Sequence, residues 1–177
     1  MMTTQNARDF AQQVLDLAWD GRLPVDPIDL AAKLTVRLTR SNGQKEKIGI
    51  VIRKQSNDQM NGASSKAFVE KTDAGLQYVI IFNNDEISYR NRFVIAHELG
   101  HLILGNITED SAPLVHHAYN GDKPEDDMAN KFALALLLPE KITRTLFPAA
   151  KTIQQFATAF GVSTTAATTR VKELRLL

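Results

Sequence analysis

The spacing of hydrophobic and polar positions is close to two in the strand-like segments between residues 35 and 83 and close to four before and after them. In the first half, apolar residues two apart predict strands over residues 35–40 and 48–52. Residues 66–70 and 78–83 flank the turn-forming residues 72–75 and predict a β-hairpin. Because the second arm of this hairpin is almost entirely apolar, we expect both of its faces to be covered.

Apolar residues three and four apart predict helices before and after these strands. The predicted helices cover residues 7–20, 28–34, 87–104, 124–138, 152–160 and 164–174. The helix over 87–104 is apolar around most of its circumference, which is typical of a buried central helix. The polar stretch 105–123 predicts a loop. Strands early in the chain and helices late in it favour an α+β fold.

The composition is that of an ordinary globular protein and excludes several classes. The 177 residues are 44% hydrophobic and 23% charged, and the net charge of +1 supplies no general attraction to nucleic acid or anionic lipid. The lack of cysteine excludes a disulfide framework, a thiol nucleophile and a thiolate metal site. The polar N-terminus has no signal-peptide core, and no apolar run approaches the roughly 20 residues of a membrane span. We therefore expect a soluble, cytoplasmic protein that does not associate with membranes.

The four histidines fall within 21 residues, and two of them form the sequence His97-Glu98-Leu99-Gly100-His101. Residues four apart lie on the same face of a helix, so these two imidazoles can converge on one Zn²⁺. Glu98 would then lie beside the metal as a general base. Two histidines can also be ordinary polar groups, but burying them with a carboxylate on an apolar helix is costly without partners. This context favours the metal.

The third ligand must come from elsewhere in the chain. A metzincin site would need glycine and histidine where this chain has Leu104 and Ile107, so a carboxylate from a later helix is expected. Three consecutive acidic residues open the helix over 124–138: Glu125, Asp126 and Asp127. Acidic residues in a first turn also favour the helix dipole without any metal. Asp126 is preferred because Asn130 shares its face and could hold a ligating histidine; Glu125 and Asp127 are the alternatives.

Three further side chains lie in the predicted loop between the two metal-bearing helices. His116, His117 or Tyr119 could donate a hydrogen bond to the oxyanion formed during peptide hydrolysis. A solvent-exposed histidine pair in a polar loop explains the same residues without a catalytic role.

With these motifs in place, the chain resembles the ImmA/IrrE-like metallopeptidase family. The similarity lies in residues 92–104, which contain the HExxH motif, and in residues 126–133 and 136–139. The resemblance also includes residues 23–26, residues 160–163, Arg170 and Leu174. It therefore covers most of the chain. In one departure, the family usually has glutamate where this chain has Asp126, which is shorter by one methylene group. The helix that carries it must therefore approach the metal more closely.

The resemblance implies a zinc-dependent endopeptidase with a gluzincin-type core, in which helices pack on a small, mostly antiparallel sheet. The metal ligands are then His97, His101 and Asp126, with Glu98 catalytic. The implied partner is a protein substrate, a helix-turn-helix repressor or antitoxin-like regulator of mobile-element or stress genes. By analogy with related zinc peptidases, the substrate would add as a strand along residues 78–83. The alternative is a binding module that inhibits a regulator without proteolysis and has a structural or vestigial zinc site.

The last two predicted helices have the proportions of a helix-turn-helix. Residues 151–177 carry a side-chain charge of +3, but threonine and alanine begin the second helix where DNA-reading helices have Arg, Asn or Gln. We therefore expect this pair to pack on a metallopeptidase domain of residues 1–150, and direct binding to nucleic acid is not expected.

Overall fold

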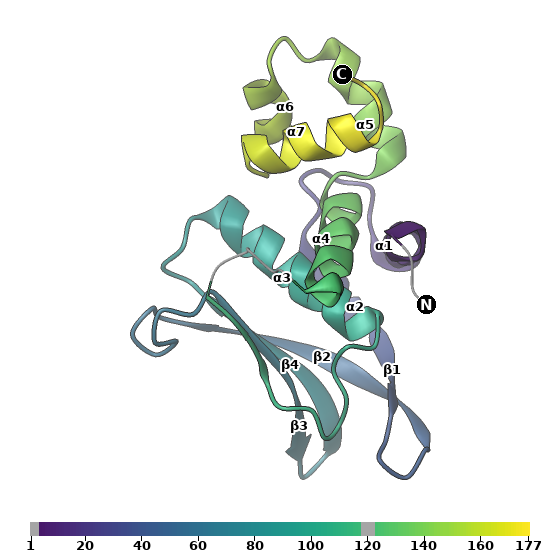
Figure 1. Ribbon diagram of the computed structural model, residues 1–177, viewed down its shortest axis with the longest axis vertical. Helices are drawn as coiled ribbons and strands as arrows, with labels where there is room; N and C mark the ends of the chain where they lie inside the picture. The colour runs from purple at the N-terminus through teal and green to yellow at the C-terminus, as the bar shows by residue number, and fades with distance from the viewer. Residues whose placement is uncertain (1–3, 118–122) are drawn as a thin grey trace.

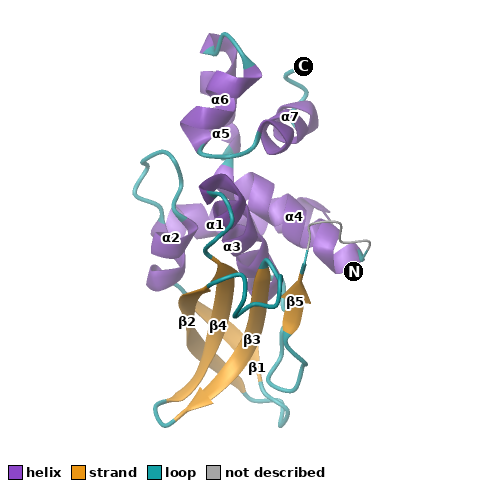
Figure 2. Ribbon diagram, turned by 90° about the vertical axis from the view of Figure 1, so that its left-hand side faces the viewer, coloured by secondary structure: helices purple, strands orange, loops and turns teal. Residues whose placement is uncertain are grey.

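A curled five-stranded sheet forms one layer of this α+β protein, and helices pack against it (Figures 1 and 2). The computed structural model describes residues 4–117 and 123–177. The strands are β1 (Thr35–Thr39), β2 (Lys45–Gln55), β3 (Ser65–Thr72), β4 (Gly75–Asn83) and β5 (Leu114–His116). The helices are α1 (Thr4–Ala18), α2 (Pro27–Lys33), α3 (Ser88–Ile103), α4 (Pro124–Leu137), α5 (Glu140–Leu146), the 3₁₀ turn η1 (Phe147–Ala149), α6 (Ile153–Phe160) and α7 (Thr164–Glu173).

The sheet is mixed, with the strand order β1-β2-β4-β3-β5. Three of the pairings among the described strands are antiparallel, and β2 pairs with β4 in parallel. The predicted hairpin is confirmed as β3 and β4, which turn between Thr72 and Gly75. The expected burial of β4 is also confirmed. Tyr78 and Ile80 lie in the main core, whereas Val79 and Ile81 pack with a second cluster on the other face.

The prediction that a substrate strand adds along residues 78–83 is wrong. β4 lies between β2 and β3, so its backbone is paired on both sides and cannot accept another strand. The apolar run was a sign of this central position. The edges of the sheet are β1 and β5. The polar stretch 105–123, predicted as a loop, contains β5, whose three residues are too few to show a strand pattern.

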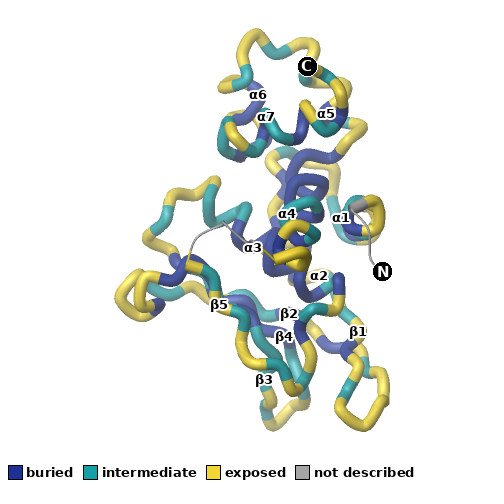
Figure 3. The backbone as a smooth tube through the Cα atoms, viewed as in Figure 1, coloured by how far each residue is buried: buried dark blue, intermediate teal, exposed yellow. Residues whose placement is uncertain are grey.

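Helices α3 and α4 form the centre of the molecule, and most of their residues are buried (Figure 3). Gly100 permits their close approach, because a Cβ atom at that position would lie only 3.1 Å from the Cα of Ala129. Helix α4 ends before Pro139, as predicted. Helix α5, which begins directly after that proline, was not predicted. Among the described residues, no helix combines the length and apolar character needed to cross a membrane.

The C-terminal helices α6 and α7 pack against the rest of the protein. Phe156, Phe160 and Val171 on these helices are buried. Buried Arg170 on α7 donates from Nε to the carbonyl oxygen of Leu138 at 3.1 Å. Lys131 on α4 pairs with Glu173 on α7 at 2.7 Å. These contacts tie the last helix to the end and the middle of α4.

Candidate metal centre

Two buried imidazoles on α3 face each other across one helical turn. His97 and His101 lie four residues apart, and their Nε2 atoms are 3.0 Å apart. The helix is buried from Val94 to Leu102, so these polar rings point into the protein rather than into solvent. The spacing that the sequence predicts therefore brings both rings to one point.

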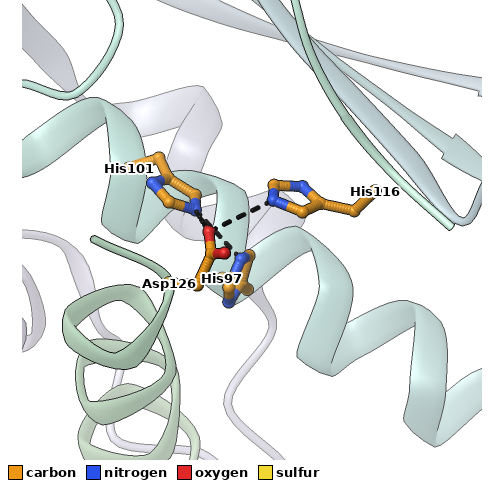
Figure 4. A group of neighbouring side chains, drawn as sticks. All are labelled: His97, His101, His116 and Asp126. Carbon is orange, nitrogen blue, oxygen red and sulfur yellow. Dashed lines mark hydrogen bonds and ion pairs between the residues drawn. The ribbon is translucent and has the colours of Figure 1, made fainter. Parts of the chain in front are cut away.

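Asp126 from α4 and His116 from β5 complete a cluster with these two residues, and all four side chains point toward one another (Figure 4). Oδ1 of Asp126 lies 3.3 Å from Nε2 of His101 and 3.4 Å from Nε2 of His116. The four donor atoms lie within 4.8 Å of one another, so together they could hold a metal ion. Three nitrogen donors and one carboxylate suit a divalent transition metal.

The second nitrogen of each imidazole contacts an oxygen outside the cluster. Nδ1 of His97 lies 2.9 Å from Oδ1 of Asn130, and Nδ1 of His101 lies 3.2 Å from Oδ1 of Asn106. Nδ1 of His116 lies 2.7 Å from Oε1 of Glu98. A hydrogen bond at Nδ1 fixes the tautomer in which Nε2 presents its lone pair, as in metal-ligating histidines.

Glu98 is completely buried beside the cluster. Its Oε1 accepts a hydrogen bond from the hydroxyl of Ser65 and contacts His116, whereas Oε2 has no hydrogen-bond partner among the described residues. Burial acts to raise the pKa of Glu98, but the hydrogen bond and the charge of His116 outweigh it and lower that pKa. The carboxylate is therefore held ionised, with one oxygen fixed and the other unpaired.

The protonation of the three histidines differs with their surroundings. Burial lowers the pKa of His97 to about 4 and also lowers the pKa of His101. The hydrogen bond with Glu98 raises the pKa of His116. His97 and His101 are thus neutral near pH 7, and neutral imidazole is the form that binds metals.

The structure places the other predicted residues outside the cluster. Glu125 and Asp127, the alternatives to Asp126, are exposed at the start of α4. His117 is also exposed, and it lines a separate cavity with Met60 and Lys66. Tyr119 lies outside the described residues. Of the acidic residues that open α4, Asp126 is the one that the fold directs toward the histidines.

Sequence reasoning gave His116 only an oxyanion role and missed Ser65 and Asn106. His116 and Ser65 meet because β5 pairs with β3, where these two residues are directly opposite each other. No local pattern reveals that pairing. The sequence contains a weak indication of Asn106, because this residue directly follows Gly105, a glycine of the kind that ends helices. In the structure, the backbone N–H of Asn106 donates to the carbonyl oxygen of His101 at 2.9 Å.

A cavity of about 590 Å³ opens beside the cluster. It is lined by residues of α3, β5 and the start of α4, including His101, Leu114, His116 and Asp126. Its volume is within the usual range of ligand-binding pockets, about 300–1,000 Å³. A reacting molecule could therefore reach His101, His116 and Asp126 from this side.

Fold and site together define an α+β protein with a buried histidine–aspartate cluster and an adjacent unpaired carboxylate oxygen. The family described as the IrrE N-terminal-like domain, Peptidase_M78, matches residues 45–172, and the chain belongs to this family. This match confirms the family predicted from the motifs. It includes the complete cluster and all strands except β1.

Two curated proteins resemble part of the chain. The radiation response metalloprotease IrrE of Deinococcus radiodurans is 31% identical over 97 residues, which are 50% of this chain and 29% of the relative. The protein of the same name from Deinococcus deserti is 33% identical over 98 residues, which are 51% of this chain and 34% of the relative. The aligned part thus spans about a third of these relatives, and both family and relatives point to a metallopeptidase.

Proposed function

We propose that this protein is a zinc-dependent endopeptidase that hydrolyses a peptide bond in a protein substrate. One observation carries the proposal: His97, His101 and Asp126 converge from two helices while Glu98 lies buried beside them with one unpaired oxygen. Two histidines and a carboxylate are a known ligand set of catalytic zinc. The match to a peptidase family and the names of the two relatives support the same chemistry.

The donor set fits zinc better than it fits magnesium or calcium. Imidazole nitrogens form most of the cluster, whereas magnesium and calcium prefer oxygen donors. Neutral His97 and His101 and the carboxylate of Asp126 would hold the ion. When bound, zinc polarises a carbonyl group and makes water more acidic near neutral pH.

Glu98 serves as the general base in this proposal. Ser65 and His116 fix its Oε1, so the orientation of the carboxylate is set before any substrate arrives. Oε2 is left to accept a proton from the attacking water and to return it to the leaving amine. The lowered pKa of Glu98 keeps it ionised for the first of these transfers.

The substrate backbone would lie along β5. This strand ends the sheet order and borders the cavity beside the cluster. An extended peptide added there would pass close to His101 and Asp126, and close to His116, which contacts Glu98. We propose a helix-turn-helix repressor or an antitoxin-like regulator as the protein cleaved, on the basis of the family resemblance. A cytoplasmic location agrees with such a partner.

The test compares Glu98→Gln with the unaltered protein. The variant should bind about one zinc per chain and lose peptide cleavage by at least about 100-fold, in line with the typical contribution of a general base. The substrate assayed is the product of the neighbouring gene, with and without a chelator. Glu140→Gln, an exposed change on α5, is the matched control and should cleave normally. Unimpaired cleavage by Glu98→Gln would refute the proposed mechanism.

A second function is favoured by the position of His116 inside the cluster. Four protein donors are typical of structural zinc sites, which have no position for water. The protein would then bind and inhibit a regulator without cutting it. Full biological activity of Glu98→Gln, with the regulator intact, would identify this function.

A further inference from the structure

We propose that His116 is a fourth protein ligand, so that the resting centre holds its metal with three imidazoles and one carboxylate. The inference rests on the metal site of the proposed function and departs from a site of two histidines and one acid. It assigns the edge strand β5 a direct part in controlling that site.

Three of the distances among the four donors are close to those of a tetrahedral set, and all four donors lie within 4.8 Å of one another. Donors about 2.0–2.1 Å from a tetrahedral ion lie roughly 3.3–3.4 Å from one another. Nε2 of His116 lies 3.4 Å from Oδ1 of Asp126, and Nε2 of His101 lies 3.3 Å from the same oxygen. The two nitrogens on α3 are 3.0 Å apart. His116 is thus nearly as close to the carboxylate of Asp126 as His101 is.

The outward contact of His116 matches that of the other two histidines. Each ring presents Nε2 to the cluster and places Nδ1 near a fixed oxygen. For His116 that oxygen belongs to Glu98, a carboxylate, which makes the imidazole a stronger donor than an amide oxygen would. Because Glu98 takes the hydrogen bond from Nδ1, a metal that displaces any proton on Nε2 would meet the lone pair of that nitrogen.

The sheet holds His116 in this position through its backbone. His116 is directly opposite Ser65 in the pairing of β3 with β5, and its carbonyl oxygen accepts a hydrogen bond from the backbone N–H of Ser64 at 2.7 Å. Leu114 and His116 are two residues apart and therefore share one face of the strand, and both line the cavity beside the cluster. The main chain thus directs the ring toward the metal ligands.

Four protein ligands leave no open position for the water that cleaves a peptide bond. Hydrolysis then requires His116 to withdraw from the centre. β5 is suited to this movement because it has three residues and forms the edge of the sheet. A substrate that pairs with β5 would shift the strand and open the site, so the same contact would bind the substrate and activate the enzyme.

A count of metal-bound imidazoles tests the proposal without any assay of activity. The full chain is labelled with ¹⁵N-histidine and loaded with ¹¹³Cd²⁺, and scalar couplings between the metal and imidazole nitrogens are observed by NMR. We expect three coupled histidines in the unaltered protein and two in His116→Ala. The control His117→Ala, which removes the exposed neighbour, should retain three.

Zinc affinity supplies a second measurement, by competition with a chromophoric chelator. His116→Ala should bind zinc at least about 10-fold more weakly, because losing a ligand costs no less than losing a residue that hydrogen-bonds to a ligand. The zinc affinity of His117→Ala should be unchanged. Two coupled histidines in the unaltered protein, together with equal zinc affinities of His116→Ala and His117→Ala, would overturn this proposal. The proposed peptidase function would remain intact. Failure of the unaltered chain to bind either metal would overturn both.

Discussion

Nδ1 of His97 on α3 lies 2.9 Å from Oδ1 of Asn130 on α4. An amide oxygen accepts hydrogen bonds, so this contact places the imidazole proton on Nδ1 and turns the lone pair of Nε2 toward the cluster. Asn130 follows Asp126 by one helical turn on the same helix. One face of α4 therefore supplies both a donor to the cluster and the group that orients a second donor.

Replacing Asn130 by alanine should weaken zinc binding about 10–100-fold, because His97 loses its fixed tautomer and orientation. The dissociation constant is measured by chelator competition at constant pH. Asn84→Ala, an exposed change after β4, is the control and should leave the constant unaltered. Equal constants for both variants would mean that Asn130 has no orienting effect.

The close contact between α3 and α4 depends on Gly100. An added Cβ would meet Cα and O of Ala129 at 3.1 and 3.2 Å, and this buried backbone cannot move aside easily. Gly100→Ala should lower the free energy of unfolding, because overpacking costs about 1–3 kcal/mol against a gain of about 1 kcal/mol in helix propensity.

Chemical denaturation measures this change, with Gly49→Ala as the control. A Cβ at Gly49 would meet nothing within 4 Å, so its effect should stay within about 0.5 kcal/mol. Zinc affinity of Gly100→Ala should fall as well, since the separation of α3 and α4 sets the distance between His101 and Asp126. A stabilised Gly100→Ala would contradict the tight contact.

Arg170 should be important for the attachment of the C-terminal helices. Its removal leaves the carbonyl of Leu138 without this donor and removes one of the charges that surround Glu173. Arg170→Ala should cost about 3 kcal/mol in unfolding free energy, the lower end for a broken buried pair, because Lys131 still contacts Glu173. Exposed Lys172→Ala on the same helix should have little effect; equal losses in the two variants would contradict this role.

The pair of Arg53 and Glu70 gives a prediction about pH. The hydrogen bond from Arg53, with a second one from Gln77, lowers the pKa of Glu70 to about 2. Because this folded-state pKa is below the ordinary value, the pair stabilises the fold above about pH 4.5. Its contribution decreases as the pH falls from there toward 2.

Carboxyl ¹³C chemical shifts of Glu70, followed through a pH titration, check this prediction. Arg53→Leu should raise the pKa of Glu70 toward its ordinary value, whereas Lys54→Leu, which removes an exposed charge from the same strand, should not. A titration near pH 4.5 in the unaltered protein would show that the pair does not form in solution.

Much of the fold was predictable because its long elements have regular patterns. The helix containing His97 and the hairpin of β3 and β4 were found within a few residues of their observed ends. Errors occurred where an element is short or its pairing is distant. β5 has only three residues, and the parallel pairing of β2 with β4 depends on how the chain crosses over, which no local pattern records.

The sequence by itself determined the pair of imidazoles on α3, because the spacing of His97 and His101 and the geometry of a helix are both local. It also favoured Asp126, through its position one turn before Asn130. Only the tertiary structure decided that His116 joins them, because that contact requires β5 to pair with β3 and α4 to pack on α3 at Gly100. Helical neighbours are fixed by bonded geometry, whereas neighbours across a sheet or between helices are fixed by the packing of the whole chain.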